Sequence, residues 1–138
     1  MQTLPAPHAL PRYDIVTIDG DDIGPEVKQS ALSVLRDACG SRPNFIAANG
    51  GAAHSATTGA LLPDGAFKAC RDHHAILHGA AGLPGITYPD GTEVGNHLHS
   101  PLRLRLDLCA DVRPIRLYRG VPLPLAGWAA GSIDCVIG

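Results

Sequence analysis

The spacing of apolar residues predicts a strand followed directly by a helix near the start of the chain. Residues 13–18 (YDIVTI) are rich in β-branched side chains, which is typical of a strand. Pro25 suits the first turn of the helix that follows, and Gly40 suits its end. The apolar face predicted for this helix consists of Val27, Ala31, Val34, Leu35 and Ala38.

Three shorter elements are predicted in the middle of the chain. Residues 44–49 (NFIAAN) favour a strand, and residues 65–72 favour a short helix with Asp64 as its cap. Residues 74–80 (HAILHGA) form a short apolar run that stops at a glycine-rich turn.

The segment 101–110 gives two conflicting signals. Four leucines alternate with polar residues from position 102 to position 108, which favours a strand. Ser100 followed by Pro101 is instead typical of a helix start, and Leu102, Leu106 and Cys109 share one helical face. Periodicity alone does not decide between the two structures.

Two further strands are predicted, over residues 115–121 and 133–137, and the second runs to the last residues of the sequence. Strands that alternate with helices indicate an α/β fold with some parallel pairing. Residues 1–12 contain three prolines and are predicted to form a loose arm. An apolar strand at the end of a chain is an unpaired edge, which we expect to favour aggregation.

The composition narrows the class of protein. The chain has 138 residues, which suits one domain, and only 17% of them are charged, against about 25% in average proteins. This shortfall indicates surface that a partner or further chain would cover. A net charge of −2 gives no electrostatic reason to expect nucleic acid or an anionic membrane as partner.

The sequence also predicts a location. No C-x-x-C pair is present, and the four cysteines are expected to be reduced: Cys39, Cys70, Cys109 and Cys135. No signal peptide pattern and no apolar run of about 20 residues occurs, so we expect a cytoplasmic protein without a membrane span.

The turn after the first predicted strand is acidic, in the stretch TIDGDDIGPEV (residues 17–27). A glycine-containing turn between a strand and a helix often binds phosphate through exposed backbone N–H groups. Asp19, Asp21 and Asp22 would repel a phosphate, so another role is expected for this turn.

Three arginines are candidates for holding an acidic small molecule: Arg103, Arg105 and Arg113. Guanidinium groups bind carboxylates through paired N–H bonds, so two converging arginines suit a dicarboxylate. The alternative is that Arg103 forms an ordinary surface ion pair with Asp107, four residues later in a helix.

Other chemistry has weaker support in the sequence. The histidines at 73, 74, 78, 97 and 99 lack the spacing of a metal site, and no nucleophilic-serine motif is present. The glycine-rich turn at residues 79–85 would let a cofactor approach the backbone closely, although glycine also serves simple flexible turns.

Three segments together resemble one family, the isocitrate/isopropylmalate dehydrogenases, which are β-decarboxylating dehydrogenases that include tartrate dehydrogenase. TIDGDDIGPEV resembles the family pattern G-D-G-I-G-P-E. TGALLPDGAFKACRDHHAILHGAAGLPG (residues 58–85) resembles its T-G-x-x-L-P segment, and LRLRLDLCADVRPIRLYRGV (residues 102–121) resembles its substrate-arginine segment.

The resemblance implies an isopropylmalate dehydrogenase-like α/β fold, incomplete here, with residues 13–98 in the large domain and 99–138 at the start of a second. It implies a homodimer that oxidises a 2-hydroxy dicarboxylate, such as 3-isopropylmalate or tartrate, with NAD or NADP and Mg²⁺ or Mn²⁺. Arg103 and Arg113 match the substrate-binding arginines. The nicotinamide end of the cofactor is expected near Gly79, Ala80, Gly82 and Pro84. The family also indicates that residues 101–110 are helical.

The sequence departs from the family pattern in ways that bear on activity. Asp22 stands where the family has a glycine, and Arg105 stands where an acidic residue is common. The family's catalytic tyrosine and lysine and its metal-binding aspartates fall after residue 138, so no catalytic or metal residue is assigned here. The chain alone is expected to be inactive. The alternative is a non-catalytic remnant or a carboxylate-binding module that keeps only the arginines.

Overall fold

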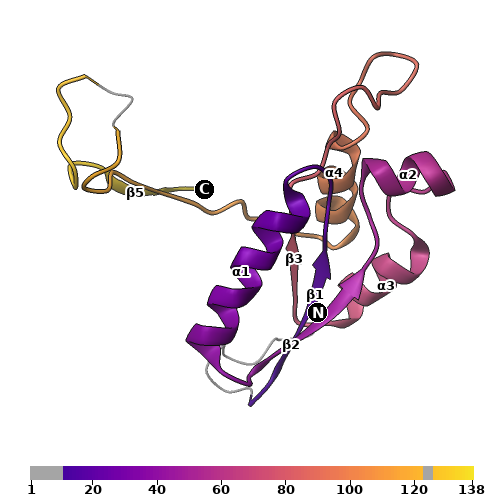
Figure 1. Cartoon of the computed structure of the whole chain (residues 1–138), viewed down its shortest axis with the longest axis horizontal. Coiled ribbons are helices and arrows are strands. Elements are labelled where there is room, and N and C mark those ends of the chain that lie inside the picture. Colours follow the sequence, from indigo (N-terminus) through magenta and orange to yellow (C-terminus); the bar gives the residue numbers. More distant parts are fainter. Residues whose placement is uncertain (1–10, 123–125) are drawn as a thin grey trace. The chain divides into compact units, whose positions relative to one another are not determined.

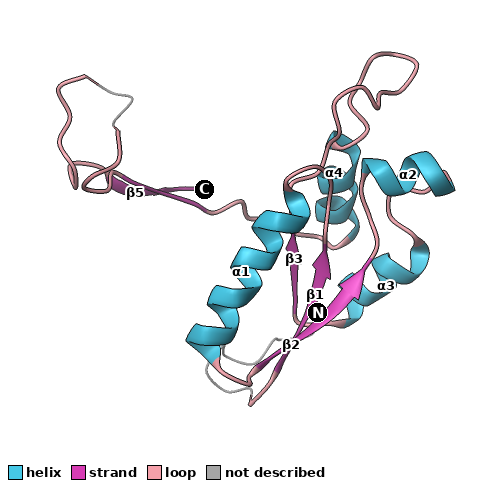
Figure 2. Ribbon diagram, viewed as in Figure 1, coloured by secondary structure: helices cyan, strands magenta, loops and turns pink. Residues whose placement is uncertain are grey.

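The computed structural model describes residues 11–122 and 126–138. They form two compact units, one that ends at Leu106 and one that begins at Asp107. Figures 1 and 2 show the elements of each unit. In chain order they are β1 (Tyr13–Ile18), α1 (Gly24–Cys39), β2 (Pro43–Ala48), α2 (Ala52–Thr58), α3 (Asp64–Asp72), β3 (Ala75–His78), α4 (Asn96–Arg105), β4 (Arg113–Arg116) and β5 (Asp134–Ile137).

The first unit is built on a parallel sheet with β1 in its middle. The strand order is β2-β1-β3, and β1 runs parallel to both neighbours. Ile18, the last residue of β1, lies opposite Ala48 of β2 and His78 of β3. The three strands therefore end together at one edge of the sheet, as the α/β prediction requires.

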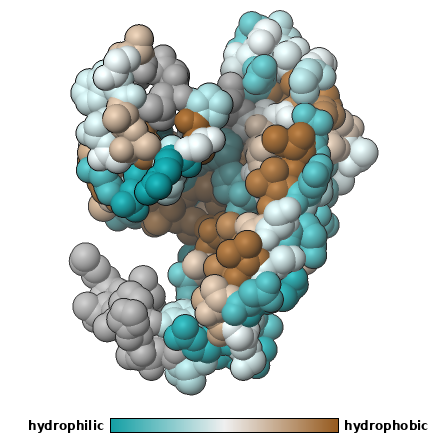
Figure 3. Space-filling view, turned by 60° about the vertical axis from the view of Figure 1, so that its left-hand side comes forward, coloured by the Kyte–Doolittle hydropathy of each residue, from teal (hydrophilic) through white to brown (hydrophobic). Residues whose placement is uncertain are grey.

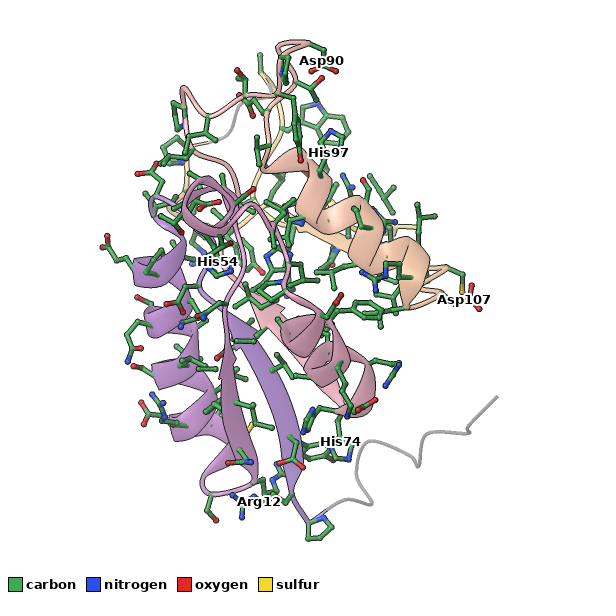
Figure 4. All side chains as sticks on the ribbon, turned by 90° about the vertical axis from the view of Figure 1, so that its right-hand side faces the viewer. Arg12, His54, His74, Asp90, His97 and Asp107 are labelled. Atoms are coloured by element: carbon green, nitrogen blue, oxygen red, sulfur yellow. The ribbon has the colours of Figure 1, made fainter. Side chains whose placement is uncertain are left out.

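Helices cover both faces of this sheet (Figure 4). On one face, Val16 and Ile18 of β1 pack with Cys70 of α3 and with Leu98 and Leu102 of α4 in a buried cluster. Side chains alternate along a strand, so Thr17 points to the opposite face, where α1 lies. The main core thus lies between β1 and the pair α3 and α4.

Helix α1 confirms the predicted helix, but the predicted apolar face is only partly correct. Leu32, which the prediction left out, is 5% exposed, whereas Val27 and Val34 are 53% and 66% exposed. The apolar side chains of α1 extend around more of the helix than the described strands cover. Only the side that carries Leu32 is therefore buried. Figure 3 shows that apolar side chains reach the surface elsewhere as well.

Helix α4 settles the conflict over residues 101–110 in favour of a helix, but its predicted bounds are wrong. The helix begins at Asn96, contains Pro101 in its interior and ends at Arg105. A proline inside a helix removes one backbone hydrogen bond. Burial of Leu98 and Leu102, at 1% and 5% exposure, compensates for that loss because the two side chains lie one turn apart in the core.

The shorter elements match the predictions with altered ends. Asp64 is the first residue of α3 and Pro63 precedes it as N-cap, so Asp64 is not the cap that was predicted. β3 covers only Ala75–His78 of the predicted apolar run. Helix α2 was not predicted at all, because its sequence AAHSATT shows no amphipathic period.

The second unit contains an antiparallel pair, in which Arg113 of β4 lies opposite Ile137 and Arg116 opposite Asp134. β4 spans Arg113–Arg116, so the predicted strand over 115–121 begins two residues too late and is wrong from residue 117 onward. Every residue of both strands is exposed. A two-stranded hairpin without a buried face is at best marginally stable in water.

In the part of the chain that the structure describes, no helix has the length and apolar character needed to cross a membrane.

The two sides of α1 should respond differently to truncation. We expect Leu32→Ala to lower the free energy of unfolding by about 2–4 kcal/mol, because it removes a buried side chain and leaves a cavity. Val34→Ala on the exposed side should change it by less than about 0.5 kcal/mol. Urea titrations followed by circular dichroism measure both, and equal effects would contradict this packing.

Candidate functional site

The candidate site lies where β1 and β3 end. In an open parallel sheet, ligands bind outside the carboxyl ends of the strands, where the chain leaves neighbouring strands in opposite directions. Here β1 is followed by α1 on one face of the sheet, whereas the neighbouring β3 is followed by α4 on the other face (Figure 4). The loops after β1 and β3 therefore meet at such a point.

Backbone atoms of these two loops are in direct contact. The Asp21 N–H donates to the Ala80 carbonyl oxygen at 2.7 Å, and the Gly79 N–H donates to Ile18 at 2.9 Å. A Cβ atom added to Gly24 would lie 2.7 Å from the same Ala80 oxygen, which is closer than any real contact of this kind. Glycine at position 24 therefore serves the close packing of one loop on the other.

Asp21 links three segments through its side chain. The carboxylate oxygen Oδ2 accepts N–H bonds from Ala52 at 2.8 Å and Gly82 at 2.9 Å, and Oδ1 accepts one from Ala53 at 2.8 Å. The residue is 3% exposed. The acidic turn thus supplies an anion to backbone donors of the protein itself, which explains its charge without any phosphate.

The three N–H donors set the ionisation of Asp21. Burial by itself raises the pKa of a carboxyl group, but the bonds from Ala53, Gly82 and Ala52 stabilise the charged form more strongly. The pKa of Asp21 consequently lies below its ordinary value of 3.8. The side chain is a carboxylate at neutral pH, and both of its oxygens accept N–H bonds.

Asp22 adopts the left-handed backbone conformation, with φ of +50°. The family has a glycine here, and the sequence indicated that aspartate tolerates this conformation better than most residues. The structure agrees with that expectation. Asp22 is exposed, whereas its neighbour Asp21 is buried.

The residues predicted to approach a cofactor differ in exposure. Gly79 is buried against the β1–α1 turn, where a Cβ would overlap the backbone of Asp19 and Gly24. Gly82 is half-buried, and Ala80 and Pro84 are exposed. A ligand that approaches this loop therefore meets Ala80 and Pro84, while Gly79 is occupied in packing.

The candidate arginines are distributed over both units. Arg103 lies in the last turn of α4, within the first unit. α4 ends at Arg105, so Arg103 and Asp107 do not both lie in this helix, and the alternative Arg103–Asp107 ion pair stays a prediction. Arg105 instead places its guanidinium 3.5 Å from the centre of the Phe67 ring, a cation–π contact between α4 and α3.

Arg113 begins β4 in the second unit. Its Nη2 and Nε donate to Asp111 Oδ2 at 2.7 Å and 3.1 Å. Both side chains of this pair are well exposed, at 69% and 40%. Water screens such an exposed pair and weakens it.

The histidines serve local contacts. His74 immediately precedes β3 and accepts a hydrogen bond from the N–H of Asp14 in β1, while His97 packs on Tyr88 at the other end of the sheet (Figure 4). The rings of His78 and His99 are 4.5 Å apart, and burial together with the charge of His78 lowers the pKa of His99. Among residues 11–122 and 126–138, no three His, Cys, Asp or Glu side chains are grouped as metal ligands.

Sequence reasoning missed the central role of Asp21, because two of its three partners come from the unpredicted helix α2. A signal for it did exist. Gly50 and Gly51 precede α2, which lacks a side-chain cap of its own, so its first N–H groups need an acceptor from elsewhere. The aspartates of the β1–α1 turn were acceptors in the sequence that had no assigned role.

The parallel sheet with helices on both faces and with its loops gathered at the ends of β1 and β3 defines an open-sheet α/β protein. The sequence family described as isocitrate/isopropylmalate dehydrogenase matches residues 14–138. The chain belongs to this family, which confirms the resemblance drawn from the three motifs.

Several curated relatives are named 3-isopropylmalate dehydrogenase. A 3-isopropylmalate dehydrogenase from Frankia casuarinae is 41% identical over 123 residues, which cover 89% of this chain and 34% of the relative. One from Mycobacterium avium is 43% identical over 113 residues, which cover 82% of this chain and 32% of the relative. The chain spans about a third of the length of these relatives.

Solved structures support the fold class. An isocitrate dehydrogenase from Methylococcus capsulatus matches with a TM-score of 0.72 and 26% identity, over 90% of this chain and 33% of that protein. A β-decarboxylating dehydrogenase from Thermococcus kodakarensis matches with a TM-score of 0.62 and 29% identity, over 91% of this chain and 40% of that protein. The predicted α/β fold of the isopropylmalate dehydrogenase type is thereby confirmed.

Acidification should test the Asp21 bonds. A folded-state pKa below that of the unfolded chain stabilises the protein above about pH 4, and this contribution is lost as the pH falls through the folded-state pKa. We expect the free energy of unfolding to fall less steeply between about pH 5 and pH 2 in Asp21→Asn than in the unchanged chain. Parallel pH profiles in urea titrations would contradict the assignment.

The backbone at Asp22 should tolerate glycine but not a β-branched residue. We expect Asp22→Gly to change the free energy of unfolding by less than about 1 kcal/mol, since glycine adopts this φ freely and aspartate adequately. Asp22→Val should lower it by about 1–3 kcal/mol. Thermal unfolding of the two variants measures the difference, and a harmless valine would show that the turn adopts another conformation in solution.

Proposed function

We propose that this chain contributes to the oxidation of a malate-type 2-hydroxy dicarboxylate, such as 3-isopropylmalate, with NAD or NADP as acceptor. The observation that carries the proposal is the presence of Arg103 and Arg113 within the segment shared with relatives named 3-isopropylmalate dehydrogenase. In this proposal the two guanidinium groups bind the carboxylates of the substrate.

The chemistry of the substrate explains why arginine suits this role. A guanidinium group offers paired N–H donors that match the two oxygens of a carboxylate, and its charge persists at every physiological pH. Each such group neutralises the charge of one carboxylate and fixes the orientation of that carboxylate. In the oxidation, the hydrogen on C2 of the substrate leaves as a hydride.

The loop after β3 is the proposed neighbour of the nicotinamide. NAD or NADP, when bound, supplies the acceptor for the hydride, while the hydroxyl proton leaves to a base as the C2 carbonyl forms. Exposed Ala80 and Pro84, together with half-buried Gly82, offer little side-chain bulk there, which suits close approach of a flat ring. The role of the buried Gly79 in this proposal is to support the loop from beneath.

The described residues do not fit the divalent metal that the family implies. They contain no group of three His, Cys, Asp or Glu side chains suited to a cation. Asp21, the buried carboxylate nearest the proposed nicotinamide loop, already accepts three N–H bonds. We therefore assign no Mg²⁺ or Mn²⁺ ligand to these residues and derive no step through a metal.

Assembly as a homodimer stays a prediction.

The arginines should control binding of the acid. If calorimetry with 3-isopropylmalate, tartrate and isocitrate detects binding, we expect Arg103→Gln and Arg113→Gln each to weaken it by about 10-fold or more, the loss of a charged hydrogen bond. Arg119→Gln provides a matched control, because Arg119 is an exposed arginine in the loop after β4. Equal losses in all three variants, or no binding of any of the acids, would contradict the proposal.

We expect no turnover by the 138-residue chain alone. The chain covers about a third of its relatives, and no residue of it is assigned to the proton transfers. Absorbance at the NADH wavelength, measured with NAD, Mg²⁺ and 3-isopropylmalate, checks this expectation. Binding without turnover agrees with this proposal and also with the alternative of a carboxylate-binding module, whereas steady metal-dependent reduction of NAD would show that these residues suffice for catalysis.

A further inference from the structure

Asp21 contacts the loop after β3 at two successive points. Its backbone N–H donates to the Ala80 carbonyl at 2.7 Å, and its carboxylate accepts the Gly82 N–H at 2.9 Å. The same carboxylate is anchored from the other side by the first two N–H groups of α2. One buried residue of the β1–α1 turn therefore forms hydrogen bonds with both ends of the short stretch 80–82.

The stretch needs such a restraint. Gly82 has φ of +126°, a conformation that side-chain-bearing residues rarely adopt, and it lies in a loop with no regular secondary structure. Glycine loses more conformational freedom on ordering than any other residue. When a loop becomes ordered only on ligand binding, the entropy that it loses weakens the affinity for the ligand. A loop that is already ordered before binding avoids this loss.

We propose that Asp21 is a positioning residue, which fixes the backbone of residues 79–84 in the conformation that meets the cofactor. The cofactor role of this loop rests on the proposed function above. The positioning itself rests only on the burial of Asp21 and on its four hydrogen bonds to Ala80, Gly82, Ala52 and Ala53.

Asparagine at position 21 is the sharpest probe, because it keeps the shape of the side chain and replaces one acceptor oxygen by an NH₂ donor. Whichever way the amide turns, at least one of the N–H groups now bound to Asp21 faces a donor in place of an acceptor. Asp22→Asn makes the same chemical change at the exposed next residue and is the matched control.

Amide hydrogen exchange, measured residue by residue by NMR, gives a readout that a general loss of stability would not imitate. In the unchanged chain we expect Gly82 to exchange at least about 10-fold more slowly than Gly85, an exposed glycine of the same loop. In Asp21→Asn we expect exchange at Gly82, Ala52 or Ala53 to accelerate by about 10-fold, with β1 amides such as Val16 changed far less.

Two results would overturn the positioning role. The first is a Gly82 amide that exchanges as fast as Gly85 in the unchanged chain, a measurement that needs no variant. The second is an Asp21→Asn variant in which β1 amides accelerate as much as the most accelerated of Gly82, Ala52 and Ala53, since Asp21 would then support the fold as a whole.

Titration with NAD separates this proposal from the proposed function. If the unchanged chain binds NAD with shifts in residues 79–84, we expect Asp21→Asn to weaken binding by about 10-fold and Asp22→Asn to leave it within about 2-fold. Equal affinity in Asp21→Asn and the unchanged chain would refute positioning for the cofactor. Failure of the unchanged chain to bind NAD would contradict the proposed cofactor role of the loop, while the exchange rates still decide whether Asp21 holds it.

Discussion

The first unit of this protein depends on one buried carboxylate. Asp21 joins the turn after β1, the start of α2 and the loop after β3 through N–H bonds of 2.8–2.9 Å. These three segments come from separate parts of the chain, and two of them, the start of α2 and the loop after β3, carry the backbone N–H groups that the Asp21 carboxylate accepts. An ionised acceptor satisfies them more strongly than a neutral one would.

This arrangement gives the acidic turn a meaning that differs from that of a phosphate loop. In phosphate loops, backbone N–H groups at a strand-to-helix turn point at an anion from outside the protein. Here the N–H groups at the same edge of the sheet point at an aspartate of the protein. The glycines of the turn serve close contact between backbones, and Gly24 and Gly79 leave no space for a side chain between the two loops.

Much of the first unit could be predicted from the sequence, and the errors have physical causes. The strand at Tyr13–Ile18 was predicted with its observed bounds, because β-branched residues there coincide with a central strand whose last three residues are buried. Helix α2 was missed because its N-terminal N–H groups bond to a side chain 31 residues earlier in the chain. The start of α4 was placed too late, since the local effect of Pro101 was weighed without the burial of Leu98.

The sequence by itself determined the family, the α/β alternation and the identity of the candidate arginines, because motifs and periodicity are local properties of a chain. Only the tertiary structure decided what the three aspartates of the opening turn do. Asp19 pairs with Lys28, Asp22 adopts a left-handed turn, and Asp21 becomes the buried acceptor. Adjacent residues of one type took three roles because burial and the supply of N–H donors depend on segments that are distant in sequence.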